Sequence, residues 1–423
     1  MTPSDPNSKS SISRRALIAS AGAAAGTAAL ASLIPELGAQ QAPAITPAPV
    51  VLPDPSAAPG LASEALNSRS QFEHPTLAPT KITTGSSLSP LHDLNGTITP
   101  SDLAFQRHHN GIPTIDPAKH TLTIHGLVDR PMTFTVDDLK RFPAVSRIYF
   151  IECSGNGRAA FKTPKAEMTA QQVDGMTSNC EWSGVELKTL LREVGAQSSA
   201  KWLLAEGNDA ARLSRSIPMD KAMDDALIVY GQNGEALRPA NGYPIRLLLP
   251  GFEGNACIKW LRRIELGKEP WMFRDETSKY TDPLPNDTAR QFSFVLDAKS
   301  VITSPSFPGK MGGAGWWPIR GLAWTGRGKI ERVDVSTDGG KSWTIAEIVG
   351  QNLPKAHVRF QHMWNWDGKA TRIMSRAIDE TGYVQPTLAE FIRVRGPGTD
   401  YHYNAIRSWD IAADGSVTFG VTP

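Results

Sequence analysis

The sequence predicts an α+β protein in which a mixed α/β domain precedes an all-β domain. Between residues 91 and 290, short strands and short helices follow one another without a regular βαβ repeat. Beyond residue 290 helical periodicity disappears, and more than half of the eleven tryptophans lie after residue 300. Short strands with frequent turns then continue to residue 423, which indicates an immunoglobulin-like sandwich.

The composition is that of an ordinary globular chain. Of its 423 residues, 40% are hydrophobic and 20% are charged, which is enough to form an ample core. The net charge of +2 and the lack of a long basic run argue against a nucleic-acid partner. Three cysteines, Cys153, Cys180 and Cys257, make no disulfide framework, and at least one thiol is free. Cys180 and Cys257 could pair, but we expect separate core thiols.

Residues 1–39 are predicted to form a twin-arginine signal peptide. Arg14 and Arg15 precede an Ala/Gly-rich apolar stretch, and Leu37–Ala39 offers a cleavage site with small residues. A membrane anchor is the alternative, but the stretch is too weakly hydrophobic to favour it. This route exports folded proteins to the periplasm, so the signal hints at a cofactor inserted before export. Residues 40–90 are rich in Pro and Ala and predict an extended linker, or a strap lying on a partner.

Hydrophobic patterns place the elements of the first domain. His120–Leu127 alternates as a strand, Asp129–Pro131 is a turn, and a short helix starts near Thr135. The other predicted elements are a helix over Ser183–Val194 stopping at Gly195, a strand over Trp202–Ala205, a helical turn over Pro218–Met223, and strands over Tyr243–Pro250 and Ile258–Leu266.

The second domain shows strand patterns with turns between them. Lys329–Ser336 and Trp343–Ile345 alternate on either side of Asp338–Gly340, which predicts a hairpin. Thr371–Ile378 is a further strand, closed by the turn Asp379–Gly382.

The segment from Arg147 to Phe161 carries the most specific chemical signal. An apolar strand, Ile148–Ile151, ends at Cys153 and opens into the turn formers Ser154–Gly157. A lone thiol beside a flexible loop, with Arg158 nearby, is suited to hold a soft metal as a thiolate. From these residues alone, a buried core cysteine stays equally open, because cysteine is among the most buried residue types.

Several short motifs occur in a fixed order. They are Phe105-x-Arg107-x-His109-x3-Pro113, His125–Val128, Asp138–Leu139, the Cys-Ser-Gly-Asn loop from Cys153, Ser216–Pro218, Tyr243–Arg246 and Lys259–Leu261. This ordered set resembles the sulfite oxidase family of molybdopterin enzymes, from about Phe105 to the C-terminus. Within that family, the molybdenum subunits of bacterial sulfane dehydrogenases are the most similar. The resemblance implies a sulfite oxidase fold with a molybdenum–molybdopterin cofactor in residues 91–290, and a dimerisation sandwich in residues 291–423.

The resemblance also assigns roles to individual residues. It makes Cys153 the thiolate ligand of molybdenum, and Tyr280 the tyrosine near the oxo group of the metal. Arg107 and Arg158 match arginines that face the oxygens on the substrate sulfur, which planar guanidinium forks suit well. The cofactor contacts implied in the same way are Arg107, His109, Cys153, Asp209, Asn241, Arg246, Cys257, Ile258 and Lys259. Without the resemblance, such arginines are more often surface or salt-bridge residues, Lys259 is a solvated lysine and Tyr280 a half-buried surface tyrosine.

Two departures from the family pattern bear on the substrate. Animal and plant sulfite oxidases have a second basic residue where this chain has Gly157, and a histidine where Asn241 stands. Glycine is expected to remove charge and leave a roomier entrance, which disfavours free sulfite. The family often sends an arginine from the sandwich toward the site, and the candidates here are Arg359 and His362.

The resemblance thus predicts a periplasmic molybdenum oxidoreductase that oxidises protein-bound sulfane sulfur by oxo transfer. The chain has no Cys-x-x-Cys-His motif and so no c-type haem, and electrons are expected to pass to a separate c-type cytochrome subunit. A sulfur-carrier protein as substrate and a homodimer within a hetero-oligomer are expected, without a membrane anchor. The alternatives are a sulfite dehydrogenase of the same family, a family reductase acting on nitrate or an S-oxide, and a non-enzymatic secreted binding module without metal.

Overall fold

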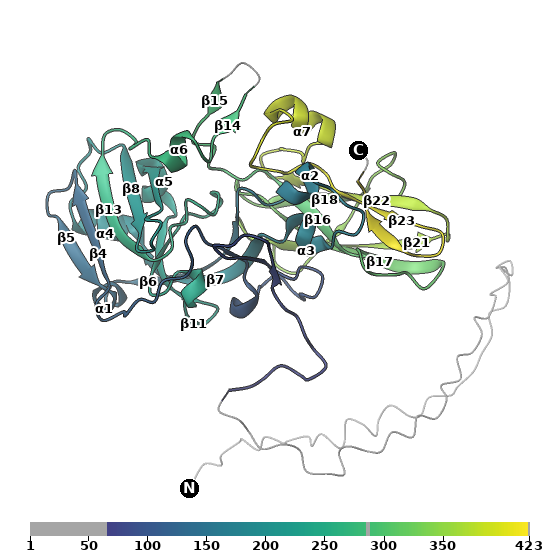
Figure 1. Ribbon diagram of the computed structural model, residues 1–423, viewed down its shortest axis with the longest axis horizontal. Helices are drawn as coiled ribbons and strands as arrows, with labels where there is room; N and C mark the ends of the chain where they lie inside the picture. Colours follow the sequence, from purple (N-terminus) through teal and green to yellow (C-terminus); the bar gives the residue numbers. More distant parts are fainter. Residues whose placement is uncertain (1–65, 285–287, 422–423) are drawn as a thin grey trace, which may run out of the picture. The chain divides into compact units, whose positions relative to one another are not determined.

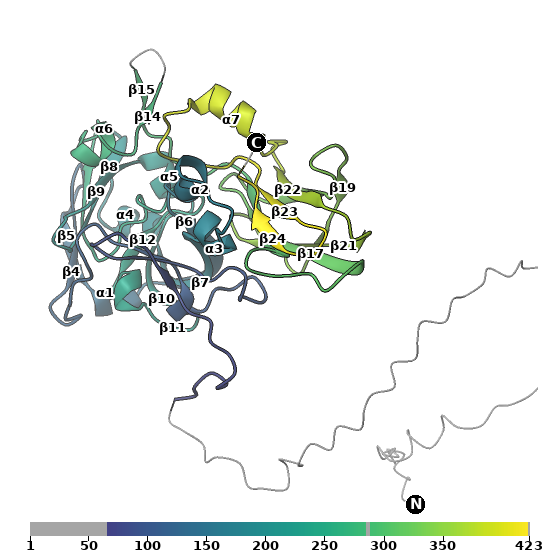
Figure 2. The same ribbon diagram turned by 45° about the vertical axis from the view of Figure 1, so that its right-hand side comes forward.

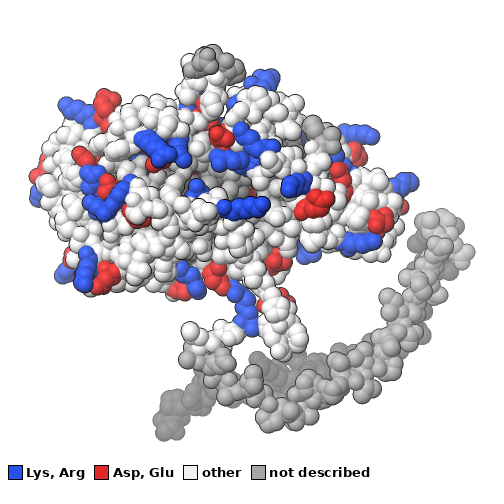
Figure 3. All heavy atoms as spheres, in the orientation of Figure 1, with Lys and Arg blue, Asp and Glu red and all other residues white. Residues whose placement is uncertain are grey.

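The computed structural model of the protein describes residues 66–284 and 288–421. The predicted signal peptide and residues 40–65 of the predicted linker lie outside these ranges. The chain divides into two units, Met1–Ser68 and Arg69–Pro423, and every element below belongs to the second. In the described part of the chain, no helix is long and apolar enough to cross a membrane. On the face seen in Figure 3, basic side chains are interspersed with acidic ones.

One five-stranded sheet of the first domain has the order β5-β4-β13-β8-β9 (Figure 1). Its strands are β4 (Thr121–Gly126), β5 (Met132–Thr135), β8 (Trp202–Gly207), β9 (Ser214–Pro218) and β13 (Leu261–Gly267). Neighbouring strands are antiparallel except β13 and β4. Alternation along β4 buries Leu122 and Ile124 completely, so the strand predicted there is confirmed.

The other five-stranded sheet ends beside the cysteine loop. Its order is β11-β10-β7-β6, with β12 also paired to β10. The strands are β6 (Ala144–Glu152), β7 (Thr177–Glu186), β10 (Leu227–Gln232), β11 (Glu235–Ala236) and β12 (Arg246–Leu248). The helices α1 (Val136–Lys140), α4 (Leu187–Glu193) and α5 (Met219–Asp224) share one core with both sheets. Strand β6 contains the predicted Ile148–Ile151 and stops immediately before Cys153.

The last part of the predicted linker is built into the fold. The strands β1 (Ala78–Pro79), β2 (Ser86–Leu88) and β3 (Gln106–Arg107) form a small sheet, and η2 (Ser101–Leu103) lies between β2 and β3. Leu88 and Leu91 are buried although the Pro-rich composition masks their pattern. The description of this stretch up to residue 90 as an extended linker is therefore wrong for its C-terminal part.

The predicted helix over Ser183–Val194 is correct only in its second half. Residues as far as Glu186 belong to β7, because Gly184 lies directly against the backbone of β10, where a Cβ would be 2.1 Å from the carbonyl oxygen of Ile228. Helix α4 then follows, and Gly195 has the left-handed φ expected of a helix stop.

The predicted strand over Ile258–Leu266 starts later than expected, at Leu261. Trp260 has a φ of 54°, which no strand residue adopts, so Ile258 and Lys259 remain in a loop. After β13 the chain forms α6 (Arg274–Thr277) and the short strands β14 (Asp282–Pro283) and β15 (Ala289–Arg290).

The second domain is a sandwich of two antiparallel sheets, as predicted (Figure 2). One sheet holds β16 (Lys299–Ser304), β17 (Gly315–Trp324), β20 (Glu347–Val349) and β21 (Val358–Trp366). The other holds β18 (Ile330–Ser336), β19 (Thr344–Ile345), β22 (Thr371–Asp379), β23 (Ser408–Ile411) and β24 (Val417–Phe419). The predicted hairpin is β18–β19. Trp324, Trp366 and Trp409 are buried in the core, whereas Trp316 is 67% exposed.

Helical structure does not end with the first domain, contrary to expectation. Helix α7 (Leu388–Arg395) lies in the second domain, and Thr387 and Glu390 form a capping box at its start. This Thr-x-x-Glu spacing is a recognised helix-start signal that the strand-rich surroundings obscured.

The sandwich packs directly on the strand that leads to Cys153. Phe150 of β6 shares a buried cluster with Trp324 and Val301 of the sandwich, and His357 stacks on its ring. The short helices α2 (Arg158–Lys162) and α3 (Ala170–Asp174), which follow the cysteine loop, contribute Ala160 and other side chains to the sandwich core. The two domains are therefore continuous around the cysteine loop.

Candidate active site

One cavity lies beside the cysteine loop and is lined by residues of the first domain. It collects side chains from segments that are far apart in the sequence. Ten of the eleven predicted site residues line it: Arg107, His109, Cys153, Asp209, Asn241, Arg246, Cys257, Ile258, Lys259 and Tyr280. Arg158 is the exception.

Cys153 presents a free, partly exposed thiol at the end of β6. Burial raises the pKa of this thiol, while a hydrogen bond from the Gly155 backbone and the charges of Arg107 and Arg158 act in the opposite direction. The net shift is upward, so protein charges alone do not hold the sulfur as a thiolate. A bound metal ion would supply the missing positive charge and remove the proton. Cys180 and Cys257 are also free, which confirms separate core thiols.

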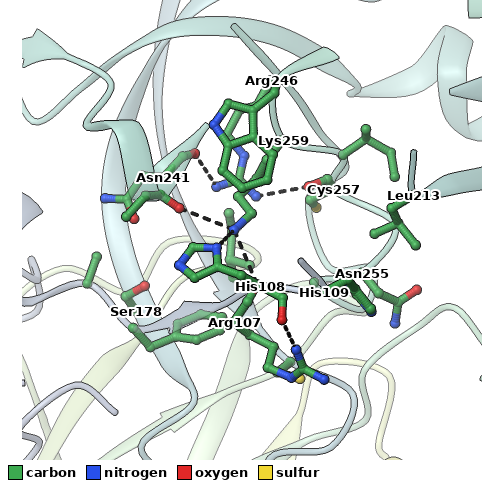
Figure 4. A pocket seen from close by; sticks show the side chains of 18 of the residues that line it. Arg107, His108, His109, Ser178, Leu213, Asn241, Arg246, Asn255, Cys257 and Lys259 are labelled. Carbon is green, nitrogen blue, oxygen red and sulfur yellow. Dashed lines mark hydrogen bonds between the residues drawn. The ribbon is translucent and has the colours of Figure 1, made fainter. Parts of the chain in front are cut away.

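Lys259 points its ammonium group into the centre of the site (Figure 4). It donates to the carbonyl oxygens of Arg107 and Ala240, each at 3.2 Å, and to Nδ1 of His108 at 2.6 Å. Burial lowers the pKa of Lys259 well below its usual range; Arg246 acts in the same direction, and Asp209 opposes it.

His108 is a site residue that the sequence analysis missed. Burial and the charge of Lys259 lower the pKa of His108 to about 3, so the imidazole is neutral and Nδ1 can accept a hydrogen bond from Lys259. Its other nitrogen lies 3.4 Å from Gln106 Oε1, which fits an Nε2 proton. The adjacent His109 in the motif was the available signal, since either histidine could face the cavity.

Arg246 opens β12 and lies buried beneath Trp182. Its two terminal nitrogens donate to the carbonyl oxygens of Asn241 and Cys257, at 2.9 and 3.0 Å. Its Nε has no partner among the described residues. Burial lowers the pKa of Arg246, and no carboxylate contributes an opposing effect.

The cavity therefore holds positive charge, buried at Arg246 and half-buried at Arg107 and Lys259, that the described residues do not balance. Within the described residues, neither Arg107, Arg246 nor Lys259 forms an ion pair, and the only acidic side chain lining the cavity is Asp209. Buried polar atoms without partners also belong to its walls: Asp209 Oδ1, Arg246 Nε and Asn255 Oδ1. Unpaired buried charge is costly, so these groups fit an anionic ligand with several hydrogen-bonding atoms. A phosphate-bearing pterin with a thiolate-bound metal has this chemistry.

Tyr280 and His109 form a contact at the cavity wall. The phenol oxygen lies 2.7 Å from His109 Nε2. Burial and the charge of Arg107 lower the pKa of His109 to about 4, while burial and Cys153 raise the pKa of Tyr280, so both groups are neutral near pH 7. Tyr280 is held at a φ of 53°, an uncommon conformation for an aromatic residue.

Arg158 does not line the cavity. Its guanidinium donates twice to the carbonyl oxygen of Asp400, at 2.6 and 3.2 Å, and stacks over Tyr401 at 5.3 Å. It remains close enough to lower the pKa of Cys153. Its hydrogen bonds nevertheless go to Asp400 in the C-terminal segment.

The expectation that Gly157 leaves a roomier entrance is wrong. Gly157 is buried with a φ of 89°, and a Cβ there would lie 2.9 Å from Arg407 and 3.0 Å from both Asp174 and Tyr403. A side chain at this position has no space, because the C-terminal segment already fills it.

Neither Arg359 nor His362 lines the cavity. Arg359 donates to the carbonyl oxygens of Leu94 and Gly96. The part of the sandwich that reaches the cysteine loop is instead the segment around His402, whose backbone N–H donates to Ser154 at 2.8 Å.

A buried, cation-rich cavity with one accessible thiol marks this as an enzyme that binds an anionic, metal-carrying organic cofactor. Residues 109–273 match the oxidoreductase molybdopterin binding domain, and residues 290–408 match the Mo-co oxidoreductase dimerisation domain. The crystal structure of the sulfane dehydrogenase SoxCD from Paracoccus pantotrophus is similar, with 44% identity and a TM-score of 0.85. That match covers 88% of this chain and 99% of the other.

Other relatives are longer proteins. The mitochondrial sulfite oxidase of Mus musculus is 31% identical over 330 residues, covering 71% of this chain and 60% of that protein. The NADH nitrate reductase of Ulva prolifera is 29% identical, covering 69% of this chain and 38% of that protein. The chain belongs to the sulfite oxidase family of molybdopterin oxidoreductases. The predicted fold class, enzyme class and molybdenum cofactor are thereby confirmed.

If Arg246 balances a cofactor anion, Arg246→Gln should weaken cofactor binding. Losing a charge-assisted contact of about 1.5–3 kcal/mol should raise the dissociation constant of the pterin about 10- to 100-fold. The pterin retained per protein after dialysis, read by fluorescence, measures this. Arg238→Gln, at an exposed arginine paired with Glu235, is the control and should retain wild-type pterin. Equal retention in both variants would contradict the assignment.

Proposed function

We propose that the chain is the molybdenum subunit of a periplasmic enzyme that oxidises sulfane sulfur bound to a carrier protein. The observation that carries this proposal is the 44% identity to the sulfane dehydrogenase SoxCD, over 99% of that chain. The sulfite oxidases reach 32% and include further sequence that has no counterpart in the match. A sulfite dehydrogenase is the second candidate, because those relatives are named for that substrate.

The bound cofactor supplies a metal that accepts two electrons and exchanges an oxygen atom with the substrate sulfur. The protein side chains bind and orient the sulfur compound beside it. Arg107 lines the cavity and lies near enough to Cys153 to lower the pKa of its thiol. Its guanidinium is placed to bind the negative charge that develops on the oxygens of the oxidised sulfur.

The contacts of Arg158 bear on the choice between the two substrate classes. Free sulfite is a small dianion that favours two cations at the reacting atom. A sulfane on a protein arm carries less charge there, and Arg107 alone can balance it. With Arg158 bound to the Asp400 carbonyl and stacked on Tyr401, the structure favours the less charged substrate.

Tyr280 can donate a hydrogen bond into the cavity. When His109 carries its proton on Nε2, the imidazole donates to the phenol oxygen, and the phenol proton is free for a ligand. The raised pKa of Tyr280 keeps this proton in place. We assign Tyr280 to orient the reacting oxygen.

The remaining parts of the proposal concern partners. Electrons would leave to a c-type cytochrome subunit, since the chain has no Cys-x-x-Cys-His motif for a haem of its own. The match to a dimerisation domain supports two copies of this chain in the assembly. A chain cut near Glu269 cannot test that pairing, because it would also lose Tyr280 and the sandwich contacts of β6.

The substrate assignment predicts different effects for the two arginines. Arg107→Gln should lower kcat/KM for the carrier-bound sulfane about 10²- to 10³-fold, as for loss of one oxyanion donor. Arg158→Gln should lower it less than about tenfold. Steady-state kinetics with oxidised cytochrome c, on carrier-bound sulfane and on sulfite, provide the comparison. Efficient oxidation of free sulfite with no activity on the carrier would establish the sulfite dehydrogenase instead. Turnover of nitrate or an S-oxide with reduced cytochrome would establish a reductase.

The periplasmic location rests on Arg14 and Arg15, which lie outside the described residues. Replacing both by Lys should leave folded, molybdenum-loaded protein in the cytoplasm. Cell fractionation with metal analysis measures this. Undiminished export of the variant would refute the twin-arginine assignment.

A further inference from the structure

We propose that two residues of the sandwich, Lys299 and Trp324, position the Cys153 sulfur by holding the carboxylate of Glu152. The sandwich would then be part of the catalytic scaffold in addition to its role in subunit pairing. The proposal rests on Cys153 being the metal ligand, and the test below separates a failure of that assignment.

Glu152 is the last residue of β6, and its side chain is only 2% exposed. Both of its oxygens are bound by donors. Lys299 Nζ donates to Oε1 at 2.6 Å, and Trp324 Nε1 donates to Oε2 at 2.7 Å. Asn156 Nδ2 adds a third bond to Oε1 at 2.9 Å. The carboxylate next to Cys153 is therefore fixed in position and in rotation.

The two sandwich donors form a matched pair. Lys299 begins β16 and Trp324 ends β17, and they are directly opposite each other in the ladder of these strands. Backbone pairing thus sets the distance between the ammonium and the indole. Trp324 is fully buried, so the pair cannot shift without disturbing the cluster around Phe150.

The same lysine balances a second buried carboxylate. Lys299 Nζ lies 3.3 Å from Asp174 Oδ1, and Arg407 Nε lies 3.8 Å from Asp174 Oδ2. Two acids and two bases are thus buried together. Removing Lys299 alone leaves an unbalanced charge, whereas removing Lys299 and the Glu152 charge together restores neutrality.

A short series of hydrogen bonds leads from the Glu152 carboxylate to the backbone N–H of Cys153. Asn156 joins Glu152 to the carbonyl oxygen of Asp174, and accepts from the Met176 N–H at 2.9 Å. The Met176 carbonyl oxygen accepts the N–H of Cys153 at 3.0 Å. The Glu152 carbonyl also accepts from Gly254, at the start of the cavity wall that holds Lys259. Glu152 therefore contacts both the segment that carries Cys153 and the loop that carries Lys259.

A purely structural role would change stability alone, so the test needs a readout of sulfur position. In metal-loaded, full-length protein, the electron paramagnetic resonance spectrum of the one-electron-reduced molybdenum reports the orientation of its sulfur ligand. In cofactor-free, full-length protein, the rate at which iodoacetamide alkylates Cys153 reports how firmly the loop holds the thiol. Peptide mass spectrometry separates Cys153 from the other two cysteines.

The variants are Lys299→Met, Trp324→Phe and the double variant Glu152→Gln with Lys299→Met. We expect shifted g-values and alkylation about tenfold faster in Lys299→Met, with a smaller change in Trp324→Phe, because the loop opens more easily. The double variant should recover thermal stability but keep the altered spectrum and fast alkylation. Trp324→Phe leaves the buried charges intact, so it carries the test if Lys299→Met fails to fold.

Two matched controls remove similar contacts elsewhere. Lys355→Met breaks another ion pair between the domains, with Asp225, and Trp409→Phe removes a buried indole bond to Ile302. Both should keep the wild-type spectrum and alkylation rate. The proposal is overturned if the Lys299 and Trp324 variants match these controls, or if the double variant regains stability and wild-type sulfur behaviour together. A wild-type spectrum in Cys153→Ser would instead show that the ligand assignment is at fault.

Discussion

The site depends on the buried carboxylate of Glu152, because it joins the end of β6, immediately before Cys153, to the sandwich. Its two oxygens accept three donors, two of them from the second domain. A second buried network supports Tyr280: Arg215 pairs with Glu253 and lies over the ring of Tyr280. Both networks are buried and have acid and base together. The cations of both networks are paired with carboxylates, and Arg215 also lies 3.7 Å from Glu276.

The charged groups of the cavity are arranged differently, because they lack partners of opposite charge within the described part of the chain. Arg246 is buried and Lys259 is half-buried, with backbone carbonyls and a neutral histidine as their partners. Among the described residues, Asp209 is the only acid in the wall. Burying charged groups in this way costs free energy, and a bound ligand of opposite charge offsets that cost. The contrast between balanced and unbalanced buried charge thus separates scaffold from binding site. It indicates an anionic ligand independently of the family comparison, and the family comparison identifies that ligand as the molybdenum cofactor.

Much of this site could be predicted from the sequence, and the predictions that were wrong have physical causes. The strand before Cys153 shows in its apolar run, and the family resemblance that the ordered motifs carry implied the ten predicted residues that line the cavity. The space expected at Gly157 was wrong because Tyr403 and Arg407, which fill it, come from the C-terminal segment, more than two hundred positions away. The contact of Arg158 with Asp400 could not be predicted for the same reason. Lys299 was missed for the same reason: a strand lysine carries no local sign of a buried acid partner. The helix predicted from Ser183 was wrong in its first half, because strand pairing with β10 overrode the helical spacing of the apolar residues.

The central claim is that the cavity holds molybdenum with Cys153 as the ligand from the protein. X-ray absorption at the molybdenum edge, on wild-type protein and Cys153→Ser, tests this most directly. The account predicts one sulfur neighbour fewer in the variant, with pterin still bound through the rest of the cavity. Cys257→Ser, which changes another cavity cysteine whose thiol instead contacts Leu249, should keep the full number. An unchanged sulfur count in Cys153→Ser would contradict the account.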